Sequence, residues 1–129
     1  MVRLALLAAV VLVAVPLAAA QDQAPRPELI ARNLVENILG EGTVRSVHVV
    51  SGGRQIVIAW NAVLYRQTHT RAKNREQLRG EAELATGAVM GVLKPQVIRF
   101  TILLNDRPLA QGTRSSDGFT ISYAKPLDG

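Results

Sequence analysis

Side chains that bind metals are scarce in this sequence. It contains two histidines, His48 and His69, and no cysteine. His48 stands in an apolar run typical of a strand, and His69 stands in a polar, basic segment. No Asp or Glu lies three or four residues from either histidine, the spacing that places two ligands on one helix face. We therefore expect no metal site.

Residues for nucleophilic or hydrolytic chemistry are present but poorly arranged. Ser115, Ser116 and Asp117 stand together, yet Ser-Ser-Asp-Gly is typical of a tight turn, and no serine has the surroundings of a nucleophile elbow. Glu81 and Glu83 lie two apart in a helical segment, so their carboxylates should point apart instead of sharing a cleft. We expect no catalytic residue, no cofactor and no enzymatic activity.

A basic segment without acidic residues follows Tyr65. Its candidate anion-binding residues are Arg66, Arg71, Lys73 and Arg75. They could bind phosphate or an anionic polymer, or they could form a solvated helix face with weak ion pairs. Nucleic acid is a disfavoured partner, because most aromatic residues that could stack on bases fall on predicted core faces.

A second candidate surface arises where polar and small residues alternate with apolar ones along the predicted strands. Successive side chains of a strand point to opposite faces of the sheet, so these residues should share one face. Its candidate binding residues are His48, Val57, Asn61, Arg99 and Thr101. The face could bind a partner, form a homodimer or remain hydrated.

The length and composition bound the class of protein. The chain has 129 residues, 48% of them hydrophobic, and a net charge of +5, which allows one domain and favours anionic surroundings. Residues 1–20 combine Arg3, an apolar run and Ala18-Ala19-Ala20, which is the pattern of a cleaved secretory signal peptide. An uncleaved anchor is the alternative. We expect a secreted or periplasmic bacterial protein, with no transmembrane helix after cleavage.

The remaining chain is expected to form a polar linker (residues 21–26), one domain (27–125) and a tail (126–129). Helical spacing of apolar residues predicts helices from Pro27 to Leu39 and from about Thr70 to Val92. Alternation predicts strands over residues 43–50, 54–65, 96–104, 108–114 and 119–123, the fourth being the weakest. The expected core is Ile30, Leu34, Ile38, Val47, Val49, Ile58, Trp60, Leu78, Val89, Phe100, Ile102, Phe119 and Ile121.

The pair Gly52-Gly53 predicts how the first two strands align. A type I′ turn needs positive φ at both central positions, which glycine adopts without strain. With these two residues at the turn, Val49 lies opposite Ile56 and Arg45 lies opposite Trp60. Each strand then places its apolar residues on the same side of the sheet.

The predicted order is α-β-β-α-β-β-β. Hairpin connections and one strongly apolar face per strand indicate an α+β fold, an antiparallel sheet of four to five strands with two helices on one face. This order, the strand containing Trp60, the polar entry Thr70-Arg71-Ala72-Lys73 and the closing hairpins resemble small exported bacterial α+β proteins of unknown function. The resemblance covers most of the domain, and it implies an architecture and no activity.

Together these features predict an exported, non-catalytic binding or structural domain of the bacterial cell envelope. Its partner would be a protein or an anionic envelope polymer. The alternative is a small extracytoplasmic hydrolase or a ligand carrier, with a pocket near Trp60.

Overall fold

The computed structural model describes residues 26–127, so the predicted signal peptide and almost all of the predicted linker lie outside the described residues. The elements follow the predicted order: α2 (Pro27–Leu39), β1 (Val44–Val50), β2 (Gln55–Asn61), α3 (Arg71–Leu93), β3 (Val97–Leu104), β4 (Arg107–Ser115) and β5 (Gly118–Tyr123). Short 3-10 turns occupy Ser51–Gly53 and Lys125–Leu127.

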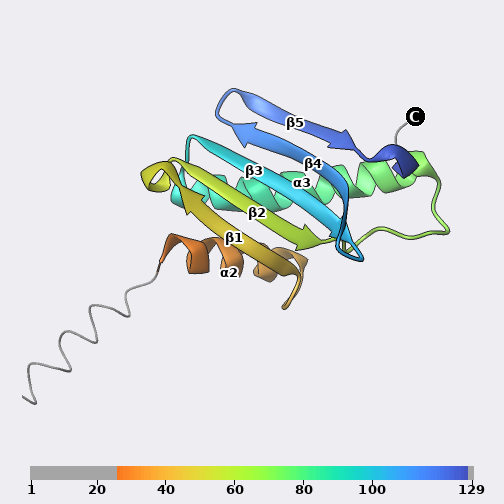
Figure 1. Cartoon of the computed structure of the whole chain (residues 1–129), viewed down its shortest axis with the longest axis horizontal. Helices are drawn as coiled ribbons and strands as arrows, with labels where there is room; N and C mark the ends of the chain where they lie inside the picture. The colour runs from red at the N-terminus through yellow and green to blue at the C-terminus, as the bar shows by residue number, and fades with distance from the viewer. Residues whose placement is uncertain (1–25, 128–129) are drawn as a thin grey trace, which may run out of the picture.

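The five strands form one sheet in the order β1-β2-β3-β4-β5, and both helices lie on the same side of it (Figure 1). The α+β fold predicted from the sequence is therefore confirmed. Neighbouring strands are antiparallel, except that β2 and β3 run parallel. The predicted antiparallel pairing is wrong for β2 and β3, because no hairpin joins them. The long helix α3 carries the chain back across the sheet before β3 begins.

The predicted alignment of the first hairpin is confirmed over most of its length. Gly52 and Gly53 have φ values of 66° and 93°, and Val49 pairs with Ile56. The prediction is wrong at the far end, where Val44 and not Arg45 pairs with Trp60. A β-bulge at Arg45 shifts the alignment by one residue, which turns Val44 into the core and leaves Arg45 exposed to contact Asp106 at 2.9 Å.

The core lies between the sheet and the helices, as expected, but several apolar residues depart from the prediction. Ile38 was predicted to be buried but is 42% exposed near the end of α2. The second strand ends at Asn61, so Leu64 leaves the sheet and is 41% exposed. At the other end of the chain, Leu127 was placed in a polar tail, but it is 3% exposed and packs against the core.

Aromatic side chains form a stack through this core. Trp60 is fully buried and lies 5.7 Å from Phe100, measured between ring centroids. Phe100 in turn lies 5.6 Å from Phe119, whose ring has the Arg79 guanidinium 5.2 Å above it. Because stacked aromatic rings bury large areas, this stack ties β2, β3 and β5 to one another on the helix side of the sheet.

Among residues 26–127, no helix is long and apolar enough to cross a bilayer.

Candidate binding face

The side of the sheet opposite the helices is covered by no other described element (Figure 1). Strand pairing aligns its side chains in rows that cross all five strands. The Arg99 row contains His48, Val57, Arg99, Thr113 and Thr120. The Thr101 row contains Ser46, Ala59, Thr101, Gln111 and Ser122. We call these two rows the candidate binding face.

A shallow hollow of about 390 Å³ lies between the two rows, over strands β2 to β5. Its lining includes three of the predicted binding residues, Val57, Arg99 and Thr101. It also includes Gln111, Thr113 and Ser122 from the last hairpin. The structure therefore brings one cation together with amide and hydroxyl groups, a set that suits a ligand carrying both negative charge and hydrogen-bonding groups.

Arg99 occupies the middle of this face, on the central strand β3. Its side chain is exposed and makes no ion pair or hydrogen bond with any residue between 26 and 127. The neighbouring hydroxyls bond within the last hairpin: Thr113 Oγ1 lies 2.9 Å from Thr120 Oγ1, and Ser122 Oγ donates to the Gln111 backbone carbonyl oxygen at 3.3 Å. Neither row contains an acidic residue, so nothing on the face neutralises Arg99.

The other two predicted residues lie away from the hollow. His48 is in the Arg99 row but on the edge strand β1, where it is exposed. Asn61 ends β2 and borders a different cavity of about 310 Å³, together with Arg45, Leu103 and Asp106. The five residues predicted as one surface therefore divide into a central group and two outlying positions.

The candidate anion-binding residues near the start of α3 have separate roles. Arg66 Nη1 donates to the carbonyl oxygens of Val63 and Tyr65 at 3.0 and 2.8 Å. Arg75 Nη1 donates to the Leu127 carbonyl oxygen at 2.6 Å, which holds the end of the described chain against α3. Arg71 and Lys73 are exposed in the first turn of the helix. Two of the four residues, Arg66 and Arg75, therefore stabilise the fold.

The Glu81 carboxylate is buried beneath the sheet. The sequence pattern predicted only that it points away from Glu83, not that it is buried. Its Oε1 accepts a hydrogen bond from Trp60 Nε1 at 3.2 Å. Its Oε2 accepts from the backbone N–H groups of Val63 and Leu64 at 3.0 and 2.7 Å. Glu81 thus holds the segment that leaves β2 against α3, while Glu83 points outward to Arg79 at 2.8 Å.

Glu81 also makes the stability of the fold depend on pH. Burial raises the pKa of the Glu81 carboxyl above its ordinary value, although the bonds from Leu64, Val63 and Trp60 oppose this shift. Between the ordinary and the raised pKa, the folded chain binds more protons than the unfolded chain, so its free energy of unfolding falls as pH rises. Below that interval both states are protonated, and the destabilising effect of the buried charge disappears.

We therefore expect the unfolding free energy of the wild type, relative to Glu81→Gln, to fall as pH rises from about 4 towards neutrality. Urea denaturation followed by Trp60 fluorescence at a series of pH values measures this difference. Because glutamine does not titrate, pH effects from all other groups cancel in the comparison. A difference that stays constant or increases with pH contradicts the assignment.

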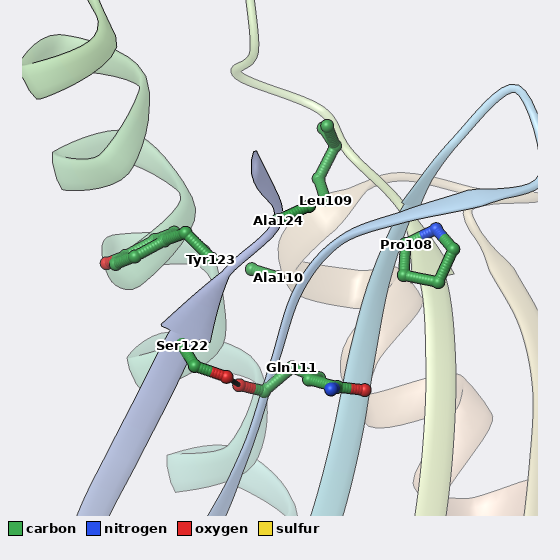
Figure 2. Close-up of a pocket in the computed structure, with 7 residues that line it drawn as sticks. All are labelled: Pro108, Leu109, Ala110, Gln111, Ser122, Tyr123 and Ala124. Atoms are coloured by element: carbon green, nitrogen blue, oxygen red, sulfur yellow. Dashed lines mark hydrogen bonds between the residues drawn. The ribbon is translucent and has the colours of Figure 1, made fainter. Parts of the chain in front are cut away.

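A smaller cavity of about 80 Å³ lies between the end of β5 and the start of β4, and its lining residues are drawn in Figure 2. Gln111 and Ser122 border it on one side, and Leu109 and Ala124 on the other (Figure 2). Tyr123 extends towards α3, where its hydroxyl donates to the Arg75 carbonyl oxygen at 3.2 Å. The cavity holds a few water molecules at most, so it extends the polar end of the Thr101 row without forming a separate ligand pocket.

No group of three or more His, Cys, Asp or Glu side chains in the described part of the chain is placed to hold a metal ion. Around Trp60, the indole ring stacks on Phe100 and the indole N–H donates to Glu81 Oε1. Comparison of the chain with protein families, with curated proteins and with solved structures finds no match.

Proposed function

We propose that this protein is an exported, non-catalytic binding domain of the bacterial cell envelope, and that it holds an anionic partner on the candidate binding face. The observation that carries the proposal is the exposed, unneutralised Arg99 at the centre of the open sheet. A guanidinium binds a carboxylate or phosphate through two parallel hydrogen bonds, which gives both energy and orientation.

The groups around Arg99 favour a polymer rich in hydrogen-bonding groups. Thr101, Gln111 and Ser122 offer hydroxyl and amide groups across strands β3 to β5. Peptidoglycan combines carboxylates, amides and sugar hydroxyls, so it matches this set more closely than a purely phosphate polymer does. The net positive charge of the chain adds a long-range attraction to any such anionic surface.

The start of α3 is the competing basic surface, and it supports the proposal less well. Arg66 and Arg75 already donate to backbone carbonyl oxygens, which fixes their geometry. Arg71 and Lys73 remain exposed, but exposed helix charges are usually just solvated. This difference between the two surfaces allows a matched test.

We expect Arg99→Glu to weaken co-sedimentation of the purified mature protein with insoluble peptidoglycan by about 10- to 100-fold, the loss of a charge-assisted bidentate contact. Arg71→Glu makes the same change in charge on an exposed helix turn, so it should leave binding nearly unchanged. Binding of the wild type should fall with added salt, since screening acts within about 10 Å at 0.1 M.

Two results would contradict the proposal. One is equal weakening by Arg99→Glu and Arg71→Glu, which would mean that net charge and not the face determines binding. The other is salt-independent binding, which would exclude an anionic partner altogether.

A further inference from the structure

The two edges of the sheet are protected very differently. At the β1 edge, the Val44 N–H donates to Glu36 Oε2 at 3.1 Å, and Arg32 Nη1 donates to the Val44 carbonyl oxygen at 2.9 Å. The bulge at Arg45 further disrupts this edge. The β5 edge, by contrast, contains no charged residue, no proline and no bulge over Gly118–Tyr123. Edge strands without such protection readily pair with another strand.

The hydrogen bonds of the last hairpin identify which groups face outward from β5. The Ala124 N–H donates to the Leu109 carbonyl oxygen at 2.8 Å, which marks that pair as hydrogen-bonded. Because such pairs alternate in an antiparallel ladder, Ser122 and Thr120 also bond to β4. Phe119, Ile121 and Tyr123 therefore direct their N–H and C=O groups towards the free edge.

From this geometry we propose that β5 pairs with β5 of a second copy of the chain, antiparallel and centred on Ile121. The strand is chemically symmetric about that residue: an aromatic and a hydroxyl residue precede it (Phe119, Thr120), and a hydroxyl and an aromatic residue follow it (Ser122, Tyr123). Pairing through Ile121 satisfies the outward N–H and C=O groups of Phe119, Ile121 and Tyr123 together. A shift of the centre to Thr120 or Ser122 leaves one of these residues unpaired.

The side chains of β5 are already fixed in positions that suit this pairing. Phe119 is held between the Phe100 ring and the Arg79 guanidinium, and the Tyr123 hydroxyl is bonded to α3. In the dimer, Phe119 lies opposite Tyr123 of the second copy, and Ile121 lies opposite its own equivalent. These side chains are half-buried in the single chain, so pairing removes the remaining apolar surface from water without reorganising the edge.

The symmetry of this pairing joins the two sheets side by side. A two-fold axis perpendicular to the sheet keeps both helical layers on one side and both candidate binding faces on the other. The open faces then form one continuous surface, in which the Arg99 row of one copy, ending at Thr120, meets the Thr101 row of the second copy, ending at Ser122. A dimer through the β5 edge therefore differs from a face-to-face dimer, which would bury both binding faces.

Sedimentation velocity at micromolar concentration tests this inference on the full mature chain. We expect the mass of a dimer for the wild type and of a monomer for Ile121→Pro. Proline at this position removes only an outward N–H and blocks an incoming strand, while the bonds to β4 remain. Circular dichroism establishes whether Ile121→Pro is folded. A second pair of variants tests the same pairing without a proline in β5.

That pair uses Thr120, which the proposed alignment places opposite Ser122 of the second copy. Thr120→Lys/Ser122→Lys sets lysines opposite each other and should weaken association roughly tenfold. Thr120→Lys/Ser122→Glu sets opposite charges in contact and should restore the dimer. His48→Glu, at the far edge of the same face, should leave the dimer intact, whereas a face-to-face dimer would lose stability.

Three outcomes would overturn the inference. They are a monomeric wild type, a dimer unaffected by the two lysines, and a failure of the opposite-charge variant to associate. The last would mean that the strands pair at another alignment or not at all.

Discussion

Replacing Glu81 with alanine should destabilise the domain by about 4 kcal/mol, because it removes the acceptor for one buried and two part-buried donors at once. The Trp60 indole N–H and the backbone N–H groups of Val63 and Leu64 all donate to this carboxylate. None of them has a replacement partner on α3 within the described residues. Urea denaturation gives the change in the free energy of unfolding, and Trp60 fluorescence reports the loss of its partner directly.

Glu83→Ala is the matched control for this experiment. Glu83 lies on the same helix, but its side chain is half exposed and only pairs with Arg79. Exposed pairs of this kind contribute about 0.5 kcal/mol. If the two variants were destabilised equally, Glu81 would not hold the segment after β2 in the way described.

Gly112→Ala should cost about 3 kcal/mol, as overpacking of a closely packed position does. A Cβ atom at Gly112 would collide with the Thr120 carbonyl oxygen of the neighbouring strand and would lie 2.8 Å from Phe100 Cζ. The carbonyl belongs to the backbone of β5 and cannot move without breaking the hairpin, so side-chain rotation cannot relieve the collision.

Gly80→Ala provides a control of opposite sign. A Cβ at Gly80 meets no atom within 4 Å, and the residue lies inside α3, where alanine is the better helix former. We expect a gain of up to about 1 kcal/mol, measured by the same denaturation. Tolerance of Gly112→Ala would contradict the close approach of β4 and β5, and destabilisation by Gly80→Ala would contradict the open space beside that helical position.

The sequence predicted those parts of the fold that depend on local patterns. Alternation located the strands, and Gly52-Gly53 set the first hairpin, because both signals arise from neighbouring residues. The bulge at Arg45 left no such signal, since it depends on contacts with α2 and with Asp106 far along the chain. The parallel pairing of β2 with β3 follows from the path of α3 and likewise could not be read from strand patterns.

The candidate binding face was predicted only in part, namely where its residues alternate clearly along a strand. Arg99 and Thr101 alternate clearly on β3, so their shared face could be inferred. Gln111 and Thr113 were missed because β4 includes Pro108 and Gly112, which weaken the strand pattern. The buried Glu81 was missed because its burial depends on a segment after β2 that passes beneath it, and a charged residue on a helix ordinarily faces water.

The most direct test of the proposed function is a map of where the partner binds. Two-dimensional NMR spectra of the ¹⁵N-labelled mature protein, titrated with soluble peptidoglycan fragments, provide this map. We expect shifts concentrated on Arg99, Thr101 and Thr113, including the Arg99 side-chain N–H, and their loss in Arg99→Glu. Shifts confined to Arg71 and Lys73, or an absence of shifts throughout the titration, would contradict it.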